Sequence, residues 1–264
     1  MTGVGFALAM TVGLATGTAA QERDFEWAGR LESGQGLAVR GISGDVVAHL
    51  ASGSEARVEA RKTGRSSDFD RVEIVMVENR DEVVFCVIYD GRGNSECDDR
   101  SDDERGERDR SVRVSVDFVV YVPEGVPFSG HTVSGDVEAL DLRSDVEATT
   151  VSGDVKVSTS GVATGRTVSG DVEVAMGSLD WQRLDFDTVS GDITVEVPAN
   201  VDAEIEFESL SGDFDSDFDM LVHSRKNGFV GQHLQATIGD GSRSMRFKTV
   251  SGDARLRRVG TDMR

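Results

Sequence analysis

The sequence of 264 residues is poor in proline, tryptophan, tyrosine and cysteine. It contains only 3 prolines, 2 tryptophans, 2 tyrosines and 2 cysteines, against 30 glycines. Beyond the N-terminus no segment repeats its apolar residues with the 3.6-residue period of an amphipathic helix. The missing helical period argues against a helical fold. The many glycines instead indicate a chain with many tight turns.

Basic residues are also scarce relative to acidic ones. The chain has 28 Lys and Arg against 48 Asp and Glu, which gives a formal net charge of −20 at pH 7. A surface of this sign repels nucleic acid and anionic lipid headgroups, so we expect no nucleic-acid partner. It suits cations, basic partners or simply solubility.

The short motifs of common enzymes are missing as well. There is no Gly-x-Ser-x-Gly elbow, no His-Glu-x-x-His and no phosphate-binding loop. The four histidines, His49, His131, His223 and His233, are far apart in the sequence and fall in no metal-binding motif. We therefore predict no catalytic residues, no cofactor and no metal ligands.

One four-residue phrase is abundant: an apolar residue followed by Ser-Gly-Asp. After a first copy at Ile42–Asp45, six more follow with serine-to-serine steps of 18, 17, 21, 21 and 40 residues. The last step is about two periods, and Ile238–Gly241 within it resembles a decayed turn. Repetition at a near-fixed period predicts stacked supersecondary units. The predicted structural-turn residues are Ser43, Gly44, Asp45, Ser134, Gly135, Asp136, Ser152, Gly153, Asp154, Ser169, Gly170, Asp171, Ser190, Gly191, Asp192, Ser211, Gly212, Asp213, Ser251, Gly252 and Asp253.

Strict alternation of apolar and polar residues follows each of these aspartates, as in Val155–Val157 and Val172–Val174. This period of two indicates a strand with one buried face. A strand rises ~3.3 Å per residue, so about 20 residues make one coil of two short strands and two corners. Ser-Gly-Asp supplies the corner, and we expect the valines before and after it to point inward. The sequence predicts an all-β fold, a β-solenoid or β-helix-like stack of short strands.

The first 20 residues carry no charge, and an apolar stretch around Val4–Leu14 precedes the small residues Thr18–Ala20. This pattern predicts a secretory signal peptide over residues 1–20. The usual Lys or Arg near the start is missing, which leaves either an atypical signal or an initiation codon further upstream. No other apolar stretch reaches membrane length. We predict an exported protein, periplasmic or at the cell surface, with no transmembrane segment in the mature chain.

Cys86 and Cys97 flank a glycine-rich turn and are 11 residues apart. In an oxidising compartment such a pair is most simply a structural disulfide, whereas a redox-active pair would be closer together. The highly charged segment Asp98–Arg110 follows. It indicates a solvated loop, with a calcium-ordered or partner-binding loop as the alternative, although the spacing of an EF-hand is absent.

Residues 21–110 are predicted to form an N-terminal β region that holds the cysteine pair and the acidic loop. Arg71–Glu78 and Glu82–Tyr89 read as a hairpin that caps the open end of the stack, because an exposed sheet edge has to be protected. Residues 111–264 are predicted to form the β-strand-repeat solenoid, continuous with the N-terminal region.

Together these segments resemble a known family. The run Val116–Val126 followed by Thr132–Val137, and the closing Phe247–Asp253, are similar to a bacterial family of exported β-strand-repeat domains labelled putative adhesins. The resemblance covers most of the mature chain and implies the same repeat fold. It carries over no catalytic residues.

We predict a non-catalytic structural or binding protein of the cell envelope, whose partner is an unknown protein or glycan. One alternative is calcium binding along the turn aspartates, which would repeat ~4.8 Å apart on successive coils. Against it stands the simpler interpretation that each Asp accepts N–H bonds of the turns. The least favoured alternative is a glycan-cleaving β-helix enzyme, since the many carboxylates show no distinguishing spacing.

Overall fold

The structure, a computed structural model, describes residues 24–32, 34–89, 112–227 and 231–259. Within these ranges lie twenty-one strands and one 3₁₀ helix, so the prediction of an all-β fold is confirmed. The elements are β1 (Phe25–Gly29), β2 (Gly36–Arg40), β3 (Val46–Leu50), β4 (Ala56–Gly64), η1 (Ser66–Arg71), β5 (Val72–Glu78), β6 (Glu82–Tyr89), β7 (Val114–Val122), β8 (Phe128–His131), β9 (Val137–Leu142), β10 (Val146–Thr149), β11 (Val155–Thr159), β12 (Ala163–Arg166), β13 (Val172–Met176), β14 (Arg183–Asp187), β15 (Ile193–Val197), β16 (Ala203–Ser209), β17 (Phe214–Ser216), β18 (Leu221–Asn227), β19 (Gln232–Ile238), β20 (Ser244–Lys248) and β21 (Ala254–Arg258).

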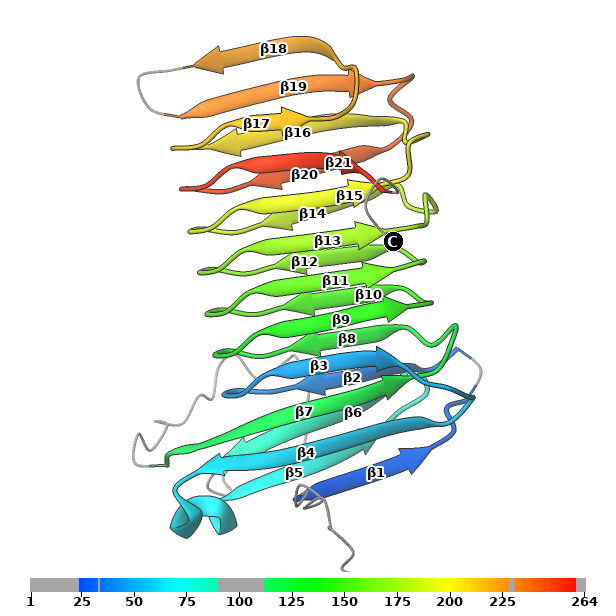
Figure 1. The fold of residues 1–264 in the computed structure, drawn as a ribbon, viewed down its shortest axis with the longest axis vertical. Helices are drawn as coiled ribbons and strands as arrows, with labels where there is room; N and C mark the ends of the chain where they lie inside the picture. The colour runs from blue at the N-terminus through cyan, green and yellow to red at the C-terminus, as the bar shows by residue number, and fades with distance from the viewer. Residues whose placement is uncertain (1–23, 33, 90–111, 228–230, 260–264) are drawn as a thin grey trace, which may run out of the picture.

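Two long sheets face each other and form an elongated stack (Figure 1). The first has the strand order β1-β4-β7-β3-β9-β11-β13-β15-β21-β17, and the second has the order β18-β19-β16-β20-β14-β12-β10-β8-β2-β6-β5. We call each pair of strands joined by a Ser-Gly-Asp corner a rung. In every rung one strand lies in the second sheet and the next in the first, so the corners line one edge of the stack, on the left in Figure 1.

Successive rungs pair in parallel and in register. Val155 on β11 lies opposite Val137 on β9 and Val172 on β13. The corners themselves are joined by bridges between equivalent serines, in the spatial order Ser43, Ser134, Ser152, Ser169, Ser190, Ser251 and Ser211. Equivalent residues of every repeat therefore form columns that run the length of the solenoid.

The rungs do not stack in chain order at the C-terminal end. The last rung, β20–β21, lies between the rungs β14–β15 and β16–β17. The 40-residue step therefore does not contain a decayed rung. Its Ile238–Gly241 segment is the connection from β19 into β20, and β18 and β19 pair antiparallel beyond β16 to end the second sheet.

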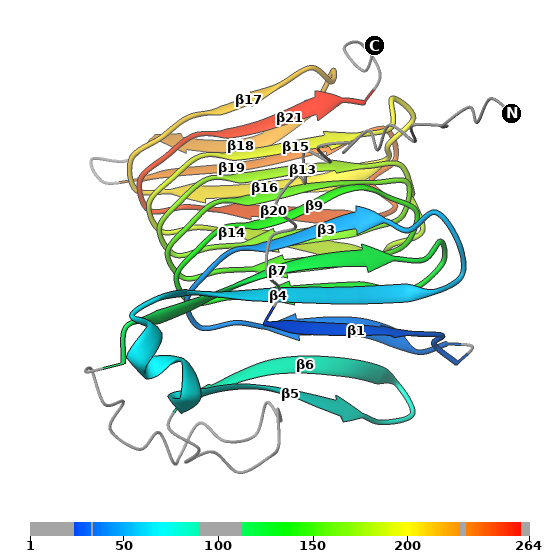
Figure 2. The same cartoon turned by 60° about the horizontal axis from the view of Figure 1, so that its bottom comes forward.

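The N-terminal end is capped in a similar way (Figure 2). β2 and β3 form a rung that pairs with β8 and β9. Beyond it the first sheet ends in the antiparallel strands β7, β4 and β1. The second sheet ends in the hairpin of β6 and β5, which confirms the predicted cap.

The residue after each corner aspartate is buried, as predicted. Val137, Val155, Val172 and Ile193 have no exposed surface. Rings from four strands fill the C-terminal third of the core, where Phe247 packs against Phe186 and Phe214 with ring centroids 5.7 and 5.4 Å apart.

The prediction that the valine before each corner points inward is wrong. Val151, Val168, Val189 and Val250 are 38–46% exposed, and Leu210 at the same position is 56% exposed. The preceding threonine is the buried residue instead: Thr150 is 2% exposed, and its hydroxyl donates a hydrogen bond to the Gly135 carbonyl at 2.9 Å. Alternation explains the difference, because the strand that buries Val146, Ala148 and Thr150 must turn Val151 outward.

Three predictions concern residues outside the described ranges: the signal peptide over residues 1–20, Cys97, and the acidic loop. Cys86 is buried on β6, and its pairing with Cys97 stays a prediction. Among the residues that the structure describes, no helix is long and apolar enough to span a bilayer.

Candidate functional site

The seven Ser-Gly-Asp corners, scattered over 211 positions of sequence, come together in one straight row. At six of them the glycine has a φ between +115° and +152°, a backbone conformation that favours glycine; Gly212, near the end of the row, is the exception. The glycines also pack on one another. A Cβ on Gly170 would overlap the carbonyl oxygen of Gly153, and the same holds at every step of the row. No other residue fits these corners without displacing backbone.

The corner aspartates form a second column, which we call the Asp ladder. The backbone N–H of Asp154 donates to Oδ1 of Asp136, and the N–H of Asp171 donates to Oδ1 of Asp154, both at 2.8 Å. The same bond recurs from Asp45 to Asp213, and Asp117 on β7 begins the series. Each aspartate from Asp45 to Asp253 thus accepts a backbone N–H of the next rung, and Asp213, at the end of the row, accepts the Gln232 side-chain amide.

The threonines before the corners form a third, buried column. The hydroxyls of Thr132, Thr150, Thr167 and Thr188 each donate to the corner-glycine carbonyl of the neighbouring rung, at 2.9–3.1 Å. Buried hydroxyls need such partners, because an unpaired one costs roughly 1–3 kcal/mol. The threonine and aspartate columns together tie each corner to the next from both sides.

Between these two columns lies a stripe of exposed aliphatic side chains. We call it the corner stripe; it comprises Val151, Val168, Val189, Val250 and Leu210. Backbone hydrogen bonds join neighbouring members of the stripe. The N–H of Val189 donates to the carbonyl of Val168, and the N–H of Val250 donates to the carbonyl of Val189. Five exposed aliphatic residues in register make a continuous apolar line. Such patches on soluble proteins mark interaction sites more often than scattered apolar residues do.

Charged side chains beside the corners mostly pair with one another. Lys156 contacts Glu173 at 3.6 Å, and Arg166 contacts Asp187 at 3.4 Å. Arg255 bridges Asp192 at 2.7 Å and Asp253 at 3.1 Å. The Asp253 N–H and then the Arg255 guanidinium hold the pKa of Asp192 below its ordinary value of 3.8.

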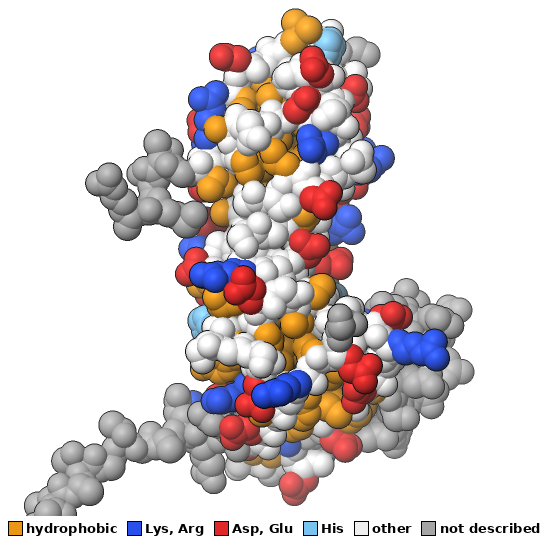
Figure 3. Space-filling view, turned by 90° about the vertical axis from the view of Figure 1, so that its right-hand side faces the viewer, with side chains coloured by type: hydrophobic (Ala, Val, Ile, Leu, Met, Phe, Trp, Pro, Cys, Tyr) orange, Lys and Arg blue, Asp and Glu red, His pale blue; other side chains and the backbone are white. Residues whose placement is uncertain are grey.

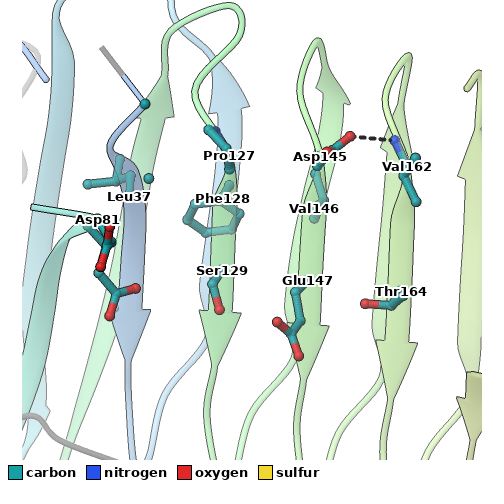
Figure 4. Close-up of a pocket in the computed structure, with 13 residues that line it drawn as sticks. Leu37, Asp81, Pro127, Phe128, Ser129, Asp145, Val146, Glu147, Val162 and Thr164 are labelled. Atoms are coloured by element: carbon teal, nitrogen blue, oxygen red, sulfur yellow. Dashed lines mark hydrogen bonds between the residues drawn. The ribbon is translucent and has the colours of Figure 1, made fainter. Parts of the chain in front are cut away.

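A hollow of about 410 Å³ lies elsewhere, over β2, β8, β10 and β12 (Figure 4). Ser129, Glu147 and Thr164 place side-chain oxygens there from three adjacent strands, and Asp81 lies at one end. One carboxylate is already committed, since the Val162 N–H donates to Asp145 Oδ1 at 2.9 Å. The hollow is open to solvent.

The fold brings together one cluster that the sequence does not suggest. Antiparallel pairing of β16 with β19 sets His233 opposite Glu208, and with Glu206 their ligand atoms lie within 4.8 Å of one another. Arg246 on β20 already contacts both carboxylates, Glu208 at 2.9 Å and Glu206 at 3.7 Å. The hydrogen bond to Glu208 is the main cause that raises the pKa of Arg246. Arg246 therefore offsets part of the negative charge of this cluster.

The opposite edge of the solenoid has a different character (Figure 3). There the connections between rungs vary in length and sequence, and apolar patches alternate with side chains of both charges. The corner row is the surface on which one chemical pattern repeats.

Comparison with known proteins finds one family match and similar solved structures. Residues 128–257 match the family model described as Toastrack DUF4097, which confirms the resemblance found in the sequence. Two solved structures are similar: a putative cell adhesion protein from Clostridium sporogenes (10% identity, 89% of this chain and 99% of that chain, TM-score 0.43) and a putative adhesin from Bacteroides fragilis (11% identity, 91% and 98%, TM-score 0.38). No curated protein matches the chain.

Proposed function

We propose that the protein, whose residues 128–257 match the family model described as Toastrack DUF4097, is an exported, non-catalytic binding protein of the cell envelope that contacts its partner through the corner stripe. Export rests on the signal peptide predicted over residues 1–20. The partner is a protein or a glycan of the envelope.

The observation that carries the proposal is the exposure of one aliphatic residue at each of five neighbouring corners. The five side chains leave 38–56% of their surface in water, so each contributes less to the core than a buried residue would. Full burial of a valine is worth roughly 1.5–3 kcal/mol, and a partner that covers the stripe gains the part of this free energy that the fold leaves unused. The aspartate and threonine columns hold the stripe straight and rigid, so little conformational entropy is lost when a partner binds.

A fourfold variant tests the proposal: Val151→Thr, Val168→Thr, Val189→Thr and Val250→Thr. Threonine has nearly the shape of valine and suits a strand, and all four side chains are partly exposed, so the fold should survive. We expect the variant, without residues 1–20, to lose at least tenfold in its retention on bacterial envelope extract and on a glycan array.

A matched control removes exposed apolar side chains elsewhere, with Leu221→Thr, Val222→Thr and Met76→Thr. This variant should bind like the unmodified protein. Equal retention of all three proteins, or equal loss by both variants, would rule out the corner stripe as the contact surface.

A further inference from the structure

The Asp ladder runs alongside the corner stripe, because each stripe residue lies three positions before a ladder aspartate; the ladder then continues past the stripe to Asp136 and Asp45. From Asp45 to Asp253, each ladder carboxylate commits one oxygen to a backbone N–H of the next rung. Asp45, Asp136, Asp154 and Asp171 carry four successive negative charges, and none of them has an ion pair with any residue that the structure describes. Strand spacing sets neighbouring charges ~4.8 Å apart.

The neighbouring columns do not cancel this charge. Lys156 forms an ion pair with Glu173, and Arg166 forms one with Asp187. Within the described residues, only Arg255, towards the C-terminal end, reaches the ladder itself. At the rungs of Val151 and Val168 the row therefore presents exposed aliphatic side chains beside carboxylates, Asp154 and Asp171, that no cation of the described chain neutralises.

We infer that the partner of the corner stripe is a basic polypeptide segment, whose apolar side chains cover the stripe while its Lys or Arg side chains reach the Asp ladder. This inference rests on the proposed function and names the chemistry of the partner. Complementary charge beside an apolar contact gives such a segment both affinity and orientation.

The same pattern disfavours other occupants. A second copy of the chain would bring two Asp ladders together, and like charges facing one another oppose binding. Anionic lipid headgroups and nucleic acid meet the same repulsion. A glycan would find only aliphatic side chains on the stripe, because none of its five members is aromatic and offers a flat face to a sugar ring.

Three synthetic 12-residue peptides test the inference by fluorescence anisotropy with the chain lacking residues 1–20. One repeats Lys-Leu, one repeats Glu-Leu and one repeats Lys-Ser. We expect the Lys-Leu peptide to bind at least tenfold more tightly than either of the others, with an affinity that falls as salt rises. Equal binding of Lys-Leu and Glu-Leu would overturn the inference.

A charge variant tests whether the ladder is the contact: Asp136→Asn, Asp154→Asn and Asp171→Asn. An asparagine Oδ1 still accepts the N–H of the next rung, so the corner bonds are kept while three charges are lost. The control, Glu147→Gln, Asp180→Asn and Asp240→Asn, removes three exposed charges elsewhere. We expect at least tenfold weaker Lys-Leu binding for the first variant and less than twofold for the second.

Equal weakening by both triple variants would show that net charge alone draws the peptide, which would overturn the inference. The outcome is separable from that of the proposed function. If the threonine variant of the stripe loses envelope binding while the Lys-Leu peptide fails to bind, the stripe remains the contact surface and the basic partner is wrong.

Discussion

Replacing Gly170 by valine should unfold the solenoid or destabilise it by at least about 4 kcal/mol, a size reached only by a few mechanisms of disruption. Gly170 has a φ of +143°, where a β-branched residue is strained. A Cβ there would also overlap the Gly153 carbonyl, which cannot move because it accepts the Thr167 hydroxyl. Urea unfolding monitored by circular dichroism measures the loss.

Two control variants separate these causes. Gly125 has a φ of +81°, but no other side chain or backbone segment lies within 4 Å of the point where its Cβ would be, so Gly125→Val reports the strain of positive φ alone. Gly53 has neither the unusual φ nor a close neighbour, and Gly53→Val should be nearly neutral. If the Gly170→Val protein unfolded at the same urea concentration as the Gly53→Val protein, the corner geometry described here would be contradicted.

Truncation of Phe247 to alanine should cost roughly 3–5 kcal/mol, as expected for a fully buried aromatic ring. In a stack that followed chain order, β20 would lie at the outer end, where such a loss would be smaller. In this structure β20 lies inside the second sheet, and Phe247 has no exposed surface. It packs between Phe186 and Phe214. Denaturant unfolding gives the change in free energy.

A leucine in the outer strand provides the control for this variant. Leu221 lies on β18 at the edge of the same sheet and is 67% exposed, so Leu221→Ala should change the stability by less than about 0.5 kcal/mol. If Phe247→Ala were no more costly than Leu221→Ala, β20 could not be an interior strand.

Much of this fold could be predicted from the sequence, because one turn phrase at a near-constant spacing leaves few alternatives. The alternation of apolar and polar residues after each aspartate predicts a strand there, and it also predicts that Val155 and Val172 are buried, as they are. Extending the same count backwards through Val146, Ala148 and Thr150 would have placed Val151 outside. The alternation along the strand, and not the hydrophobic character of the side chain, decides which face Val151 occupies.

Other features were not predictable from one sequence. The insertion of β20–β21 between earlier rungs leaves no local trace, since the corner at Ser251 has the same letters as the corner at Ser190. The meeting of Glu208 with His233 depends on the register of an antiparallel pair. The position of the β20–β21 rung and the contact between Glu208 and His233 both depend on which strands pair and in which register, and not on the types of residue involved.

The Asp ladder bears on the calcium hypothesis raised by the sequence. Aspartates do recur on successive rungs, as that hypothesis requires, but each is used to accept a backbone N–H across the rungs. This bond accounts for the repeated aspartate without a cation. It also explains why Ser-Gly-Asp recurs as a unit: glycine permits the close approach, and aspartate joins the backbones that glycine brings together.

Paired cysteines in the corner row test the rung order most directly. Equivalent positions on adjacent rungs lie ~4.8 Å apart, within the Cα separation that a disulfide spans, whereas positions two rungs apart do not. Ser190 and Ser211 belong to corners that follow one another along the chain, but the corner of Ser251 lies between them in the structure. We expect Ser190→Cys with Ser251→Cys to form a disulfide under mild oxidation, detected by peptide mass spectrometry, and Ser190→Cys with Ser211→Cys to remain reduced. A disulfide between positions 190 and 211, with none between 190 and 251, would contradict the fold described here.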